Sequence, residues 1–239
     1  MNAEKTVDQL QKELEMANKE LASLTYSISH DLRSPLQVID GFSEALAEEY
    51  RDKLDEQGRD YLQRIRGAAA RMENLIENLL ELARVTRTEI RHERIDVSEV
   101  AQSIADELIR SEPARNVRFS IEAGLTVEGD PHLVRVALEH LLRNSWKFTS
   151  KHPAALIEVG TEEKEGRRLF FVRDDGAGFD PTYVSKMFGA FQRLHSASEF
   201  KGTGIGLAMV RRIVRRHGGD VWAVGQVEKG ATVYIDWNE

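Results

Sequence analysis

The chain is built around the octapeptide Ser29-His30-Asp31-Leu32-Arg33-Ser34-Pro35-Leu36. Apolar residues precede and follow it at steps of three and four, the spacing of one helix face. Three successive steps of four run through the octapeptide, and such a stutter locally unwinds a heptad seam. His30 is turned about 200° from this apolar line, so we expect its imidazole to point to solvent. The members of the line are Leu14, Ala17, Leu21, Leu24, Ile28, Leu32, Leu36, Ile39 and Leu46.

The octapeptide lies in the first of two predicted helices. Residues 1 to about 50 form one long pattern that Pro35 interrupts, and a proline inside a helix predicts a kink just after His30. The apolar pattern lapses near residues 51–58 and returns from Tyr61 to about Val85. Two helices joined by a short turn form a hairpin that cannot bury its apolar line alone. The sequence therefore predicts a homodimer closed as a four-helix bundle.

Composition excludes several classes of function. The chain has 239 residues with a net charge of −7, which gives no reason to expect nucleic-acid binding. It has no cysteine, which rules out disulfides, thiolate metal sites and cysteine nucleophiles. No apolar run approaches the roughly 20 residues of a membrane span, and the start lacks a signal-peptide pattern. We expect a cytoplasmic protein whose upstream sensor domain is absent from this chain.

The remainder of the chain alternates short strands and helices. Asp96 with Glu99 is typical of a capping box, and Asp130 before Pro131 predicts the start of a helix that runs through Phe148. Other helices are expected after Asp180 and over residues 204–217, and strands over 117–121, 156–161, 168–173, 221–225 and 232–237. We expect three parts: an N-terminal coiled-coil helix (1–24), a dimerising helical hairpin (25–89) and a compact domain of strands and helices (90–239).

Three stretches of the second part carry candidate chemistry. Residues 174–178, Asp-Asp-Gly-Ala-Gly, follow a buried strand: the carboxylate can accept an exocyclic amine and the glycines admit a flat ligand, although a plain turn is an equal alternative. Residues 202–206, Gly-Thr-Gly-Ile-Gly, open a helix and can bind phosphate through backbone amides, yet match neither a Rossmann nor a Walker A loop. Asn144 and Lys147 share a helix face, where an amide oxygen can ligate Mg²⁺ and an ammonium can neutralise phosphate. Taken alone, this pair favours the alternative of a helix C-terminus with a solvated lysine.

Taken in order, these motifs resemble the sensor histidine kinases of two-component signalling. The octapeptide, residues 140–149, 174–178, 188–191 and 202–207 correspond to that family's H, N, G1, F and G2 boxes. The wording of the H box and of Phe191-Gln192-Arg193-Leu194-His195 is most similar to kinases linked to phytochrome or PAS sensors. The resemblance implies a HisKA hairpin that dimerises, followed by a Bergerat-type (GHKL) α/β sandwich.

The resemblance also implies the activity, an ATP-dependent protein-histidine autokinase that uses Mg²⁺. His30 would be the phosphoacceptor, and Asp31 would polarise its imidazole or act as its base. The phosphoryl group would then pass to an aspartate of a response-regulator receiver domain. Ser34 replaces the family's usual Thr or Asn, so phosphatase activity toward the regulator stays open.

The same resemblance assigns the nucleotide-binding residues. Asp174 would read the adenine amine, Asn144 would hold Mg²⁺, Lys147 would contact phosphate, and Arg193 would approach the γ-phosphate. His140 departs from the family, which often has an asparagine there. The remaining residues would admit the base (Gly176 and Gly178), bind phosphate and hinge a lid over residues 189–203 (Gly202, Gly204 and Gly206), or assist adenine binding (Thr232).

The other histidines lack metal-ligand spacing and are interpreted as surface residues, and the lid phenylalanines as packing residues. Two alternatives stay open: a dimerising scaffold that binds ATP without catalysis, and a GHKL ATPase of the chaperone or DNA-repair type. The sequence does not indicate whether phosphorylation occurs in cis or in trans. The histidines and phenylalanines concerned are His92, His132, His152, His195, His217, Phe188, Phe191 and Phe200.

Overall fold

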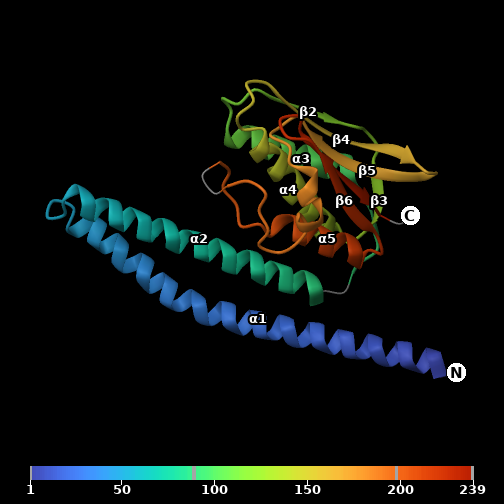
Figure 1. Ribbon diagram of the computed structural model, residues 1–239, viewed down its shortest axis with the longest axis horizontal. Coiled ribbons are helices and arrows are strands. Elements are labelled where there is room, and N and C mark those ends of the chain that lie inside the picture. The colour runs from blue at the N-terminus through green and yellow to red at the C-terminus, as the bar shows by residue number, and fades with distance from the viewer. Residues whose placement is uncertain (1, 88–89, 197–198, 238–239) are drawn as a thin grey trace. The chain divides into compact units, whose positions relative to one another are not determined.

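The computed structural model describes residues 2–87, 90–196 and 199–237, and the chain divides into two compact units, residues 1–88 and 89–239. The first unit is a helical hairpin and the second is an α/β sandwich (Figure 1). This order confirms the predicted fold class. No helix in the described part of the chain is long and apolar enough to cross a membrane.

The hairpin consists of α1 (Asn2–Glu49) and α2 (Glu56–Arg87). The helix α1 continues through Pro35, and the kink expected there stays a prediction. In the turn, the Tyr50 carbonyl accepts hydrogen bonds from the amides of Lys53 (2.9 Å) and Leu54 (3.1 Å). Asp55 then caps the start of α2 by accepting from the Gly58 amide at 2.7 Å.

The predicted apolar line of α1 divides between two faces. Leu36 packs with three residues of α2 in the hairpin core, Ala69, Ile76 and Leu80. Seven residues to either side of Leu36, Ser29 and Ser43 are also buried, so the core of the hairpin contains small polar residues that the apolar pattern did not predict. The rest of the described line is 42–54% exposed and forms a separate apolar face: Leu24, Ile28, Leu32, Ile39 and Leu46.

The second unit is organised on a five-stranded sheet in the order β2-β4-β5-β7-β6. The first pair is parallel and the other three pairs are antiparallel. The strands are β2 (Val117–Ile121), β4 (Ala155–Lys164), β5 (Arg167–Asp174), β6 (Asp220–Gly225) and β7 (Ala231–Asp236). A separate two-stranded ladder of β1 (Glu93–Asp96) and β3 (Thr126–Gly129) was not predicted from the sequence.

Helices α3 (Val97–Ser111), α4 (Pro131–Phe148) and α5 (Gly206–Arg216) lie on the same side of this sheet (Figure 1). Alternate residues of β4 and β5 face these helices, among them Ile157, Val159, Phe170 and Val172, and all four are buried. The core of the unit therefore lies between the helices and one face of the sheet. Strand alternation places neighbouring residues on opposite faces of this layer.

Side-chain caps begin the helices where the sequence predicts them. Asp96 Oδ1 accepts from the Glu99 amide at 2.9 Å, and Asp130 Oδ1 accepts from the Leu133 amide at 3.1 Å. The segment after Asp180 forms η1 (Pro181–Lys186), a 3₁₀ helix rather than an α-helix. The last helix begins at Gly206 rather than at residue 204, because Gly204 has a φ of 76° and cannot be part of a right-handed helix.

Candidate functional site

The hairpin presents His30 and Asp31 to solvent. Their side chains are 73% and 78% exposed, and His30 Nδ1 lies 3.5 Å from Asp31 Oδ1. Ser34, one helical turn further along, is also exposed. The outward orientation of His30 expected from the periodicity is confirmed, and the arrangement leaves the imidazole open to an incoming reactant.

In the second unit, Asp174 ends β5 with its carboxylate directed toward α4. Its Oδ2 accepts from Ser145 Oγ at 2.9 Å, and its Oδ1 accepts from the Gly176 amide at 3.1 Å. Burial raises the pKa of Asp174 to about 6, although both hydrogen bonds favour the ionised form. A buried carboxylate with so little compensating charge is typical of a ligand-binding position.

The glycines after Asp174 are required first by the protein's own backbone. A Cβ at Gly176 would lie 2.6 Å from the Phe148 carbonyl oxygen, and one at Gly178 would collide with the Gln226 carbonyl oxygen. Gly178 also has a φ of 60°, which favours glycine. The predicted loop therefore packs closely against the end of α4 and against the turn between β6 and β7.

The side chain of Thr232 lies on the opposite face of the sheet from the side chain of Asp174. It pairs across strands with Arg173, and its Oγ1 accepts from Arg173 Nε at 3.2 Å. Because residues 173 and 174 are neighbours in β5, their side chains lie on opposite faces of the sheet. The predicted adenine contact of Thr232 therefore does not fit this structure. Ala231, whose backbone hydrogen-bonds Asp174, is the β7 residue at this position.

A cationic cluster lies further along α4. Lys147 Nζ donates to Asn144 Oδ1 at 3.1 Å and lies 4.3 Å from the centre of the Phe148 ring. Burial and, to a smaller extent, the nearby charge of Arg193 together lower the pKa of Lys147 to about 8. A Cβ at Gly202 would lie 3.2 Å from the same Nζ. The structure thus brings the predicted N box, lid arginine and first loop glycine together.

Arg193 belongs to the lid and holds its backbone. Its Nη2 donates to the carbonyl oxygens of Phe200 (2.6 Å) and Ser196 (3.4 Å). The side chain of Phe200 is buried, whereas Phe191 is 55% exposed with a φ of 61°, so its predicted packing role is wrong. The described part of residues 189–203 contains no helix or strand.

His195 anchors the lid to the loop after β5, a contact missed when it was interpreted as a surface residue. Its Nε2 lies 2.9 Å from the Gly178 carbonyl oxygen, which can only accept, so Nε2 carries the proton of this hydrogen bond. The ring also lies 5.2 Å from Phe148 and 5.1 Å from Phe200, centre to centre. Spacing alone could not have revealed this role, because the three rings meet only in the folded chain.

The remaining loop glycines lie at the start of α5. A Cβ added at Gly204 would lie 2.6 Å from the Gln192 carbonyl oxygen, and one added at Gly206 would lie 3.2 Å from the His140 ring. Within the described residues, Ile205 provides no side-chain cap at the N-terminus of α5. The anion site that the glycine pattern predicts there stays a prediction.

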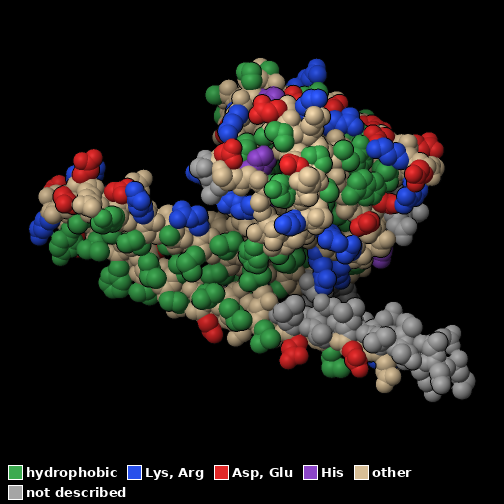
Figure 2. Space-filling view, viewed as in Figure 1, with side chains coloured by type: hydrophobic (Ala, Val, Ile, Leu, Met, Phe, Trp, Pro, Cys, Tyr) green, Lys and Arg blue, Asp and Glu red, His purple; other side chains and the backbone are tan. Residues whose placement is uncertain are grey.

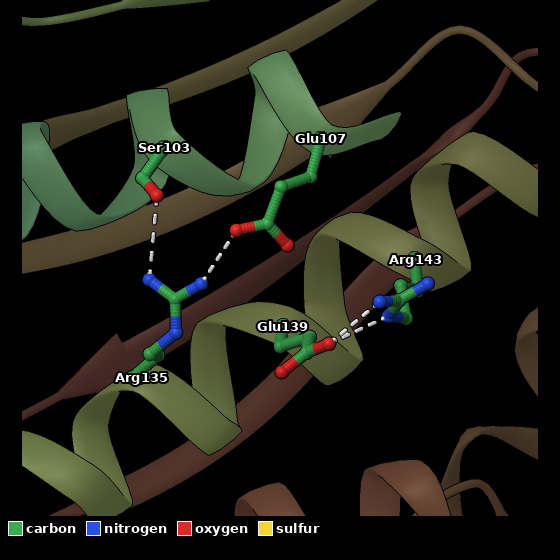
Figure 3. A network of polar contacts seen from close by, with 5 residues as sticks. All are labelled: Ser103, Glu107, Arg135, Glu139 and Arg143. Atoms are coloured by element: carbon green, nitrogen blue, oxygen red, sulfur yellow. Dashed lines mark hydrogen bonds and ion pairs between the residues drawn. The ribbon is translucent and has the colours of Figure 1, made fainter. Parts of the chain in front are cut away.

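The helix that carries Asn144, Ser145 and Lys147 is fixed along its length. Arg135 of α4 donates to Glu107 of α3 at 2.8 Å and to Ser103 at 3.5 Å (Figure 3). Figure 3 also shows Arg143 donating twice to Glu139 of the same helix, at 2.9 and 2.7 Å.

Both ends of α4 are anchored as well. At its start, His217 Nε2 accepts from the Asp130 amide at 3.0 Å while Nδ1 donates to the Ile213 carbonyl at 2.8 Å, another role missed by the surface interpretation. At its end, Arg115 donates to the Trp146 carbonyl at 2.8 Å.

The donor set fits Mg²⁺ only together with phosphate. Among the described residues no group of three or more His, Cys, Asp or Glu side chains could hold a metal ion. Asn144 offers one neutral oxygen, and hard Mg²⁺ usually takes one or two protein ligands besides substrate phosphates and water. Asn144 Oδ1 is paired with Lys147 here, so Lys147 must move away for the amide to ligate a cation.

The comparisons with known proteins agree with this geometry. The family model described as "His Kinase A (phospho-acceptor) domain" matches residues 20–88, and "Histidine kinase-, DNA gyrase B-, and HSP90-like ATPase" matches residues 129–239. The methanogenesis regulatory histidine kinase FilI of Methanothrix harundinacea is 35% identical, over 92% of this chain and 25% of its own length. Cyanobacterial phytochrome B of Nostoc sp. is 34% identical, over 95% of this chain and 30% of its own length.

Among solved structures, full-length ShkA in complex with AMPPNP superposes with a TM-score of 0.64 at 25% identity, over 89% of this chain and 45% of ShkA. The second unit is thus a GHKL-type ATPase domain. With the phosphoacceptor hairpin before it, the chain belongs to the sensor histidine kinases. It spans between a quarter and a third of the length of the first curated relatives it matches.

Proposed function

We propose that the chain is a kinase core that binds ATP in its second unit and phosphorylates His30. The observation that carries this proposal is that one turn of α4 lies next to both a buried carboxylate and a pair of cations. Ser145 donates a hydrogen bond to Asp174, and two residues later Lys147 lies near Arg193 and the glycine loop that begins at Gly202. Adenine offers an amine to the carboxylate, and a triphosphate offers negative charge to the two cations. An uncharged ligand would leave the cations unmatched.

The remaining residues act on the phosphates. Mg²⁺ bound with the nucleotide supplies charge neutralisation at the phosphate oxygens, and Asn144 would hold it once Lys147 turns to phosphate. The amides of Gly204 and Gly206 at the start of α5 bind the phosphate chain. Arg193, released from the lid carbonyls, contributes positive charge to the γ-phosphate.

The chemical step uses the exposed imidazole. With its proton on Nδ1, directed toward Asp31, His30 presents the Nε2 lone pair to the γ-phosphorus. A nitrogen–phosphorus bond forms as the bond to the leaving oxygen of ADP breaks, and the ring gains a positive charge. Its Nδ1 proton then passes to the Asp31 carboxylate, which leaves neutral phosphohistidine. Phosphoryl transfer depends mainly on positioning and on neutralisation of charge, which the two units supply separately.

The exposed apolar face of the hairpin supports a homodimer. Phe42 is 70% exposed, Tyr61 54% and Ile28 54%, and Figure 2 shows apolar side chains along the hairpin. A contiguous face of this kind needs a partner. A second hairpin would complete a four-helix bundle, with domain limits near residues 25 and 89.

The phosphoryl acceptor is proposed to be an aspartate on a receiver domain. Ser34 could orient a water molecule that hydrolyses the aspartyl phosphate of that domain. The hairpin carries a groove of about 570 Å³ whose surface is mainly apolar and whose rim includes Asp40, Arg51, Arg59 and Arg66. Arg66 pairs with Asp40 at 3.6 Å, and it also pairs with Glu44 at 2.8 Å. We place receiver docking there. A kinase core works where ATP is supplied, so the proposal places it in the cytoplasm.

The test is labelling with γ-³²P-ATP. The wild-type chain should give an acid-labile phosphoprotein and His30→Gln none, while both bind ADP equally. Unchanged labelling of His30→Gln refutes the phosphoacceptor. Nucleotide binding without labelling supports the non-catalytic scaffold, and steady ATP hydrolysis without any phosphoprotein supports the chaperone-type ATPase. Asn144→Asp tests the Mg²⁺ ligand, and mixing it with His30→Gln distinguishes cis from trans transfer, because only trans transfer restores label.

A further inference from the structure

Ser145 is a buried polar residue of α4 whose hydroxyl group contacts the carboxylate of Asp174. It is 4% exposed, and its hydroxyl donates to Asp174 Oδ2 at 2.9 Å. A carboxylate oxygen only accepts, so the direction of this hydrogen bond is fixed while Asp174 is ionised. Ser145 also directly follows Asn144, so the same turn of helix serves both the base and the phosphates.

The protein groups that face Asp174 nearly all donate to it. Gly176 donates its amide to Oδ1 at 3.1 Å, and the backbone of Ala231 in β7 adds another hydrogen bond. Burial and the neighbouring charge of Asp175 act in the opposite direction. Ser145 is the one side chain among these donors, so it is the only one that a substitution can remove without altering the backbone.

The protonation state of Asp174 decides which base it can recognise. An ionised carboxylate accepts from the exocyclic amine of adenine but repels the carbonyl oxygen at the same position of guanine. A neutral carboxylic acid has an O–H donor and can satisfy that carbonyl. Burial raises the pKa of Asp174 to about 6, so the carboxyl group changes its protonation state just below neutral pH. A small change in its hydrogen bonding therefore changes the fraction of Asp174 that is ionised, and with it the base that the site can bind.

We propose that Ser145 is a positioning residue for nucleobase selectivity: its hydroxyl holds Asp174 as an oriented acceptor, so that the site takes adenine and rejects guanine. This inference rests on the proposed ATP site. A merely structural role for the hydroxyl would weaken all nucleotides alike, whereas the proposed role changes the ratio between two bases.

The experiment measures dissociation constants of ADP and GDP for the full chain by calorimetry between about pH 5.5 and pH 8. Both ligands carry the same diphosphate, so ionisation of phosphate cancels in their ratio. The wild type should prefer ADP at about pH 7.5 and lose that preference below about pH 6. Ser145→Ala should lower the preference roughly tenfold at about pH 7.5 and move its loss to higher pH.

Two further variants make the result decisive. Ser145→Cys keeps the volume but donates weakly, so its preference should fall between those of the wild type and Ser145→Ala, and it substitutes for the alanine variant should that one not fold. Ser103→Ala, a serine of α3 bonded to Arg135, should behave as the wild type. Tryptophan fluorescence, which reports the second unit, checks the fold of each variant.

An unchanged ADP/GDP ratio in Ser145→Ala and Ser145→Cys would overturn the inference, as would an equal loss of both affinities. In either case retained ADP binding leaves the proposed function intact. Failure of the wild type to bind ADP at all would instead refute the nucleotide site on which both depend.

Discussion

Replacing Asp174 by asparagine should stabilise the second unit while weakening its recognition of adenine. Asp174 is a buried acid whose pKa burial raises to about 6 from an ordinary value of 3.8. The folded unit therefore binds a proton more tightly than the unfolded chain does. Between about pH 4 and pH 6 the free energy of unfolding falls as pH rises, and above about pH 6 the penalty is constant.

The size of the effect follows from the shift. Each pKa unit corresponds to about 1.4 kcal/mol, so a shift of about 2 units costs the folded state about 3 kcal/mol at neutral pH. Asparagine removes the charge but can accept from only one of the two donors, Ser145 Oγ and the Gly176 amide. Losing one such hydrogen bond costs about 1 kcal/mol, so a net gain of about 2 kcal/mol is expected.

The assay is urea denaturation of the full chain followed by tryptophan fluorescence. All three tryptophans, Trp146, Trp222 and Trp237, lie in the second unit, so the signal reports that unit alone. Asp174→Asn should raise the free energy of unfolding by about 2 kcal/mol at about pH 7.5. At about pH 4, where Asp174 is protonated in the wild type, the variant should gain nothing and lose up to about 1 kcal/mol for the missing hydrogen bond. Asp175→Asn is the matched control beside it and should gain less than about 0.5 kcal/mol.

Two results would refute the reasoning. A gain independent of pH would mean that the charge of Asp174 is not what destabilises the unit. A loss of stability at about pH 7.5 would mean that the carboxylate is better solvated or paired than its burial indicates. The expected result would mean that the buried carboxylate of Asp174 lowers the stability of the unit and is retained because it binds a ligand.

Three further predictions concern other parts of the molecule. Ser29→Ala should stabilise the hairpin by about 1 kcal/mol in thermal unfolding followed by far-UV circular dichroism, because the buried Ser29 Oγ has no hydrogen-bond partner among the residues that the structure describes. The exposed Ser27→Ala is its control, and a destabilised Ser29→Ala would contradict the assignment. Phe42→Lys should weaken the dimer at least tenfold in analytical ultracentrifugation, whereas Gln37→Lys on the opposite face should not. His217→Ala should cost the second unit roughly 1–3 kcal/mol, because it leaves the amide of the buried Asp130 unpaired, and an effect as small as that of the exposed His152→Ala would be evidence against this contact.

The architecture could be predicted because its signals are local. A helix period, a turn and a capping aspartate are each set by a few adjacent residues, and the caps at Asp96 and Asp130 lie where the sequence places them. The five boxes also keep their order along the chain. Such features need no knowledge of which distant segments meet.

The parts that could not be predicted depend on register and on tertiary pairing. Thr232 falls on the wrong face for adenine because its side depends on the pairing of β7 with β5, where residue 232 lies opposite 173 rather than 174. The division of the α1 apolar line into a core face and an exposed face depends on where α2 packs. The two strands β1 and β3 have four residues each, too few for a periodic signal.

The folded chain separates selectivity from gating. The residues proposed to recognise the base, the metal and the phosphates lie within one turn of α4. This helix is fixed at its start by His217, along its side by Glu107 and at its end by Arg115. A helix held at so many points can keep donor positions exact enough to discriminate one base from another. The lid is held differently, by Arg193 bonding to lid carbonyls and by His195 bonding to Gly178. In the proposed function, Arg193 acts at the γ-phosphate and the loop after β5 receives the base, so nucleotide binding would have to exchange these bonds. Substitutions in α4 should therefore alter which nucleotide binds, and substitutions in the lid should alter how fast it is released.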